Sequence, residues 1–186
     1  MKAKIVFSLF MVVMVPLIFL SSCSNFKNLA AFDVAYTMPR TTFTFTPVPL
    51  KAGGEQLLYS GSVAANLDSI MNSHGVSSGI VGNTFFTKCS ITIQSPSTLT
   101  FDWLQSARAE ISLNPDFSPS QEVGSVTNTT PQAKTVVLVL NNTNIRPYLG
   151  SRFFYFRVFG VLNGTVPSQF VQMYMDGQLQ MHIEPL

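Results

Sequence analysis

Apolar and polar residues alternate along most of the chain with the period of two that is typical of β-strands. Phe43 and Phe45 alternate with threonines in the run TTFTFT, which predicts a strand with one apolar face. Further strands are expected over 56–60, 122–127 and 152–162, and turn-forming Pro, Gly and Asn residues separate them. The pattern therefore predicts a mainly β protein.

Two of the predicted strands have an assigned inward face. In the first, the inward residues are expected to be Phe85, Thr87, Cys89, Ile91 and Ile93. In the second, Ala107, Ala109, Ile111 and Leu113 are expected to face inward, and Arg108, Glu110 and Ser112 outward. Cys89 is accordingly interpreted as a buried small hydrophobe rather than a reactive thiol.

Two later segments carry stronger patterns. Residues 134–140 are apolar on both faces and rich in valine, as expected of a central strand. In 171–183 the apolar residues all have odd numbers, and this parity runs unbroken through Asp176-Gly177. A two-residue hairpin turn at that dipeptide would pair apolar with polar side chains on one face. One long strand is therefore predicted, with Gly177 as a bulge or bend.

One short helix is expected near 62–73. Val63, Leu67, Ile70 and Met71 form a single apolar stripe at helical spacing, Ser62 can cap the first turn, and the helix is expected to end at Gly75. Eight or nine strands with one helix indicate a two-sheet antiparallel β-sandwich over 32–186. A jelly roll and an immunoglobulin-like sandwich both fit the periodicity.

The charge of the chain argues against nucleic-acid partners. Charged residues make up only 11% of the sequence. From Cys23 onward, four lysines and five arginines balance nine acidic residues, because Lys2 and Lys4 lie in the leading segment. No basic patch is left to attract a polyanion.

Residues 1–22 have the layout of a secretory signal peptide. Lys2 and Lys4 precede an apolar run over 5–20, which is shorter than the roughly 20 residues of a membrane-spanning helix. The run ends in Leu20-Ser21-Ser22-Cys23, which resembles the lipobox of bacterial lipoproteins. The resemblance implies cleavage before Cys23 and acylation of its thiol and its new amine, so that lipid anchors the protein to a membrane.

The resemblance also bears on location and layout. Ser24 stands where an aspartate is a common signal for retention in the inner membrane of bacteria, which favours the outer membrane. Residues 23–31 would form a lipidated tether, and the rest one domain on the periplasmic or outer surface. The overall layout is similar to exported lipoproteins that carry a single β-sandwich of unassigned function.

The sequence indicates no catalytic centre. His74 and His182 are the only histidines, and neither has the spacing of a metal ligand. Nucleophile-elbow, phosphate-loop and dinucleotide motifs are absent from the sequence, and the acidic residues are scattered. A non-catalytic protein without metal or cofactor is therefore expected, and a hydrolase is the least favoured class.

The functional hint lies in the aromatic strand. Tyr155 and Arg157 share one face of it, and Phe170 and Tyr174 belong to the more polar side of the last strand. If these four side chains cluster in solvent, they suit a glycan or an envelope protein as partner. The alternative is that a helix, a loop or a neighbouring domain covers this face. A second hypothesis is a structural protein or carrier of hydrophobic ligands, in which the interior holds an acyl chain.

Overall fold

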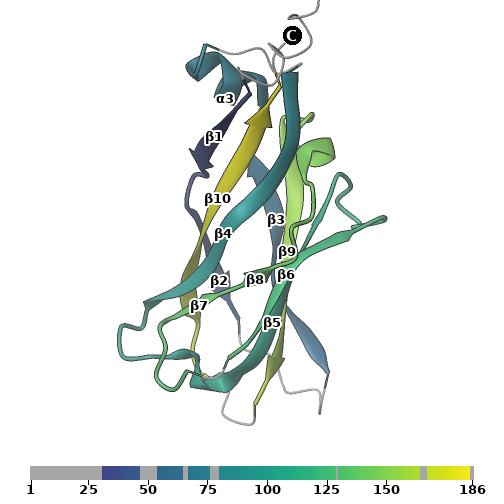
Figure 1. Cartoon of the computed structure of the whole chain (residues 1–186). Helices are drawn as coiled ribbons and strands as arrows, with labels where there is room; N and C mark the ends of the chain where they lie inside the picture. Colours follow the sequence, from purple (N-terminus) through teal and green to yellow (C-terminus); the bar gives the residue numbers. More distant parts are fainter. Residues whose placement is uncertain are drawn as a thin grey trace, which may run out of the picture.

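The structure is a computed structural model, and it describes residues 31–46, 54–64, 67–75, 80–128, 130–163 and 167–184. Within them, ten strands form two five-stranded sheets that pack face to face (Figure 1). Sheet A contains β1 (Phe32–Thr37), β2 (Thr41–Phe45), β4 (Val81–Ser95), β7 (Thr135–Val137) and β10 (Val171–Ile183). Sheet B contains β3 (Glu55–Ala64), β5 (Leu104–Ser112), β6 (Gln121–Thr127), β8 (Val139–Leu140) and β9 (Phe153–Leu162). The predicted signal peptide and Cys23 lie outside the described residues.

The strand order decides between the two predicted sandwiches. Sheet A has the order β1-β10-β4-β7, with β2 also paired to β10, and sheet B has the order β3-β9-β5-β6-β8. We count β1 and β2 as one interrupted strand, and β7 and β8 as another. The eight strands that result then have the order 1-8-3-6 in sheet A and 2-7-4-5 in sheet B, where the second half of strand 6 lies beside strand 5. This antiparallel arrangement is a jelly roll. The prediction of a mainly β sandwich is confirmed.

The last strand is one unbroken element, as predicted. All seven odd-numbered residues of β10 are buried, and every even-numbered one is at least partly exposed. The bulge expected at Gly177 lies instead in the partner strand β4. Gln178 pairs with Lys88 and Leu179 with Phe86, so Thr87 is an extra residue in β4. Gly177 instead lets the sulfur of Met38 approach, at 3.0 Å from where a Cβ would stand.

The extra residue corrects the predicted inward face of β4. Between Gly82 and Thr87 the buried residues are even-numbered, Thr84 and Phe86, and after Thr87 they include Cys89, Ile91 and Ile93. Phe85 and Thr87 were expected inside and do not belong to the buried set. A bulge moves the following side chains to the opposite face, so a constant period over the whole strand was the wrong assumption.

The apolar segment 134–140 is not a central strand. Its first part, β7, pairs with β4 at the edge of sheet A, and its second part, β8, pairs with β6 at the edge of sheet B. The chain crosses between the sheets at Leu138, whose side chain is buried, while Val137 and Val139 face outward and are exposed. Val136 and Leu138 are the buried residues of the segment, so only one of its two apolar sides packs on the core.

The helix α3 (Leu67–Ser73) is shorter than predicted. Ser62 and Val63 belong to β3 instead of its first turn, although Val63 is buried as expected. Leu67, Ile70 and Met71 do form the buried stripe. After His74 the chain leaves the helix at Gly75, which has a φ of 69°.

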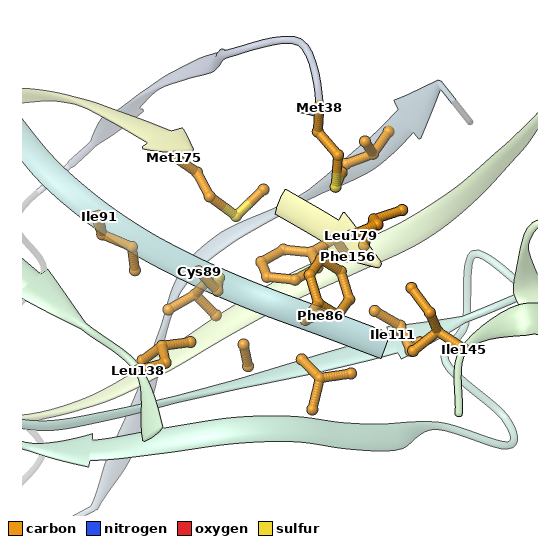
Figure 2. Close-up of a cluster of buried hydrophobic side chains, with 14 of the residues drawn as sticks. Met38, Phe86, Cys89, Ile91, Ile111, Leu138, Ile145, Phe156, Met175 and Leu179 are labelled. Atoms are coloured by element: carbon orange, nitrogen blue, oxygen red, sulfur yellow. The ribbon is translucent and has the colours of Figure 1, made fainter. Parts of the chain in front are cut away.

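Side chains from both sheets fill the space between them (Figure 2). Phe86 and Cys89 from sheet A meet Phe156 and Ile111 from sheet B, with Leu138 beside them. Cys89 is buried, and burial raises the pKa of its thiol to about 12. The expectation of an inert buried cysteine agrees with this position. Two 3₁₀ turns, η2 (Phe101–Trp103) and η3 (Arg146–Tyr148), close opposite ends of the sandwich.

The two ends of the sandwich can be told apart by the course of the chain. The end at which the chain enters β1 is called the tether end, and it contains Phe32, Ile183, η3 and Phe153 (Figure 1). The opposite end is called the far end, and it contains Phe45, η2 and Phe170. The 13 residues of β10 run from the far end to the tether end, a length of about 40 Å. Among the described residues, no helix is long and apolar enough to cross a membrane.

Candidate functional site

The four side chains predicted to cluster lie in three separate places. Tyr155 and Arg157 are on the outer face of sheet B, and Tyr174 is on the outer face of sheet A. Phe170 precedes β10 at the far end and is 67% exposed. The odd-numbered side of β9 and the even-numbered side of β10 point away from each other across the sandwich. The expected single surface is therefore not formed.

A loop covers the aromatic face around Tyr155 and Arg157. Phe117, in the loop 113–120 between β5 and β6, is buried and lies with its ring centroid 6.4 Å from that of Tyr155. The guanidinium carbon of Arg157 lies 4.3 Å above the Phe117 ring. Phe117 adopts a φ of 57°, an unfavourable value for an aromatic residue. The packing of its ring against sheet B offsets that strain.

Two carboxylates and two arginines form a ladder across sheet B beneath and beside this loop. Arg108 binds Glu55 through two nitrogens, at 2.7 and 2.8 Å, and also donates to Glu110. Arg157 donates to the other oxygen of Glu110 at 2.8 Å. Both arginines also lie over the ring of Phe159. The ladder is neutral and internally satisfied, so its groups are engaged with one another rather than directed at a ligand.

The pKa values of the ladder reflect these contacts. Burial raises the pKa of Glu110, but hydrogen bonds from Arg108, Arg157 and Ser120 outweigh it, and the net pKa is lowered. The hydrogen bonds from Arg108 lower the pKa of Glu55, and the bond to Glu55 is the largest cause of a raised pKa at Arg108. All three groups are held in their charged forms. A set of charged groups held in this way is better suited to fixing the loop in place than to transferring protons.

On sheet A the predicted residue Tyr174 is also covered. The guanidinium carbon of Arg40 lies 3.9 Å from the centroid of its ring, and Arg40 holds Asp176 through two contacts of 2.9 and 3.1 Å. Stacking of a sugar on that face of Tyr174 would require Arg40 to move. The ring of Tyr174 is therefore less accessible to a ligand than the sequence indicated.

The histidines occupy exposed positions. His182 Nδ1 lies 2.9 Å from Asp33, which also accepts a hydrogen bond of 2.7 Å from Gln180. The bond with His182 is the largest cause of a lowered pKa at Asp33. His74 follows α3 and is exposed. No group of three His, Cys, Asp or Glu side chains that could hold a metal ion is found within the described ranges.

A cavity of about 290 Å³, with mainly polar residues in its lining, opens at the far end and was not predicted from the sequence. Its lining comes from η2, the start of β5, the segment after β6 and the end of β9: Asp102, Leu104, Gln105, Asn128, Thr130, Pro131 and Asn163. These segments are distant in sequence, and the one local signal is a charged residue inside the apolar run Phe-Asp-Trp-Leu. The volume lies at the lower limit of ligand pockets, which hold roughly 300–1,000 Å³.

Hydrogen bonds fix part of the cavity and leave part of it for a ligand. The Asp102 carboxylate accepts from the Gln132 backbone at 2.7 Å and from Thr100 at 2.8 Å. The amide nitrogen of Asn128 donates to the carbonyls of Phe101 and Leu104. In the part of the chain that the structure describes, the exposed side chains of Gln105 and Thr130 have no hydrogen-bond partner. The cavity thus combines a fixed carboxylate with uncommitted amide and hydroxyl groups.

A wider groove of about 680 Å³ lies beside the crossing from β7 to β8. We call it the crossover groove, and its lining residues are Phe85, Phe86, Thr87, Leu138, Leu140, Asn142 and Gln180. It opens next to the extra residue of β4. Four of its seven lining residues are apolar, namely Phe85, Phe86, Leu138 and Leu140.

Comparisons with known proteins identify structural similarity alone. No protein-family model matches the chain, and no curated protein has a significant match to its sequence. Among solved structures, the chain is similar to the decameric BFDV capsid protein, with 7% identity, a TM-score of 0.40, and coverage of 83% of this chain and 99% of that one. It is also similar to a Desmodium yellow mottle tymovirus structure, with 12% identity, a TM-score of 0.30, and coverage of 84% and 90%. Function is not transferred at this level of similarity.

Proposed function

We propose that the protein is a lipid-anchored, non-catalytic binding module of the bacterial cell envelope, and that the far-end cavity binds a glycan. The lipobox-like run ending at Cys23 supports the anchor and a place on the outer membrane. An anchor before β1 leaves the opposite end of the sandwich, with its cavity, directed away from the lipid. The far-end cavity takes the place of the binding surface predicted around Tyr155 and Tyr174, because the rings of these two residues are covered.

The observation that carries the glycan proposal is the set of polar side chains in the far-end cavity. Asp102 offers a fixed acceptor, while Gln105 and Thr130 can each donate and accept. Neighbouring hydroxyl groups of a sugar ring need this mixture, and the cavity has the size for about one ring. An envelope protein as partner would instead need an extended surface at this end.

Binding is tested with full-length lipidated protein in detergent and with polysaccharide isolated from the envelope of the producing cells. Gln105→Ala and Thr130→Ala are the informative variants, because neither side chain holds the fold. Each is expected to weaken binding about tenfold, the loss of roughly 1.4 kcal/mol. Gln178→Ala, an exposed glutamine on sheet A, is the matched control. Equal binding by all four proteins would reject the cavity as the site.

The anchor is tested separately by mass spectrometry of the N-terminal peptide and by fractionation of the envelope. We expect acyl chains on Cys23 in the outer-membrane fraction, and release of the Cys23→Ser variant from that fraction. An unmodified residue 23 in the native protein would reject the lipid anchor.

A second candidate function is a carrier of hydrophobic ligands, and the crossover groove favours it. Phe85, Phe86, Leu138 and Leu140 give the groove an apolar wall. If this groove holds an acyl chain, the Leu140→Gln variant is expected to bind a fluorescent fatty acid more weakly than the native protein does. An unchanged affinity would remove this candidate.

A further inference from the structure

We infer that the tether end of the sandwich docks on the surface of the lipid bilayer through Phe32 and Phe153, which holds the far-end cavity away from the membrane. The inference rests on the lipid anchor of the proposed function. It adds a second membrane contact, made by the folded domain itself.

The two phenylalanines are exposed at the same end of the molecule. Phe32 is 48% exposed and begins β1, where it pairs with Ile183. Phe153 is 46% exposed and begins β9. The two strands belong to different sheets, but Arg146 of η3 donates to the carbonyl of Val81, which pairs with Ile183. The short segment from η3 to Phe153 therefore begins beside the end of sheet A at which Phe32 lies (Figure 1).

The length of chain before β1 decides what can cover these rings. Eight residues lie between Cys23 and Phe32, and the nine steps from one Cα to the next span at most about 30 Å when the chain is fully extended. The sandwich is about 40 Å long, which is more than this segment can span. The far end therefore cannot lie next to the anchor with the tether end pointing away from it. The bilayer is thus the one surface that the anchor keeps permanently within reach of Phe32 and Phe153.

Apolar contact, and not charge, is the expected source of the attraction. Arg146 and Arg152 precede β9 near this end, and Asp33 of β1, Asp68 of α3 and Glu184 after β10 lie there too. The described residues of this end therefore carry no excess of positive charge for anionic lipid. Aromatic side chains are favoured at the level of lipid headgroups, and two of them add to the attachment that the acyl chains supply.

The test places a tryptophan at Phe153 in the full-length lipidated protein and reconstitutes it into phosphatidylcholine vesicles with brominated acyl chains, which quench nearby indoles. Leu57→Trp is the matched control, because Leu57 is similarly exposed, at 52%, on β3 of the same sheet but away from the tether end. The native Trp103 is the sole tryptophan in the sequence and is buried at the far end, so its contribution is a common background.

We expect the variant Phe153→Trp to lose a several-fold larger fraction of its emission than Leu57→Trp. Equal quenching of both variants, or of neither, in protein that floats with the vesicles would overturn the docking and leave the anchor intact. Protein that does not float with the vesicles would overturn the anchor and the docking with it. Phe32→Trp provides an independent second probe, and it must be quenched like Phe153→Trp for the inference to stand.

Discussion

The outer faces of the two sheets pair arginines with carboxylates in different surroundings. On sheet B, Glu110 is 7% exposed and receives bonds from both Arg108 and Arg157, under a loop that closes over them. On sheet A, Asp176 pairs with Arg40 only, among the residues that the structure describes, and both side chains are at least partly exposed to water. Exposed ion pairs contribute little to stability, whereas the loss of one member of a covered network leaves charges without partners. Stability and loop position should therefore depend on sheet B far more than on sheet A.

The largest expected effect comes from Glu110→Ala. It leaves two partly covered arginines without a shared partner, and we expect the free energy of unfolding to fall by about 3 kcal/mol. Urea unfolding followed by far-ultraviolet circular dichroism measures it. Asp176→Ala is the matched variant on sheet A, with an expected loss several-fold smaller. Similar losses in the two variants would contradict the contrast between the faces.

A smaller effect is expected from Phe117→Ala. The change removes the ring that packs on Arg157 and Tyr155 at the surface of sheet B, and we expect a loss of about 2 kcal/mol in the free energy of unfolding. Hydrogen exchange is expected to rise in 113–120 and to stay unchanged in β10. Uniform exchange across both segments would show that the loop does not depend on this ring.

The smallest effect is the dependence of stability on pH. Because the pKa values of Glu55 and Glu110 are lowered in the folded protein, the unfolded chain takes up protons first as the pH falls. Their contribution is complete above about pH 4.5, the ordinary pKa, and is lost as the pH falls through the lowered values. Urea midpoints measured from pH 6 to pH 3 should decline less in Glu55→Gln than in the native protein. Asp33→Asn removes another carboxyl group with a lowered pKa, but from an exposed pair, so its urea midpoint should decline less than that of the native protein and more than that of Glu55→Gln.

The fold could be predicted where one local rule held along a whole element. In β10 the alternation of Val171, Met173 and Met175 with polar residues was sufficient, because one face of the strand packs on the core throughout. In β4 the same rule gave the wrong face for Phe85, because an extra residue is visible only in the pairing with β10. The segment 134–140 showed its apolar character but not that it divides between two edges.

The candidate sites depend on neighbours that are remote in sequence, and the prediction of them was correspondingly poor. Tyr155 and Arg157 were identified as one face of a strand, yet Phe117, which covers them, comes from a loop without a periodic pattern. The far-end cavity brings Asp102 beside Asn163, 61 residues later, through the packing of two strand ends. Side-chain periodicity contains no information about such meetings of loops.

The crossing from β7 to β8 has a consequence for how the protein behaves in a crowded compartment. One short segment closes a lateral edge of each sheet, with three residues on β4 and two on β6. Each closing strand is too short to serve as a template on which another molecule could extend the sheet. The protein can therefore be concentrated on a two-dimensional surface without polymerising through these edges.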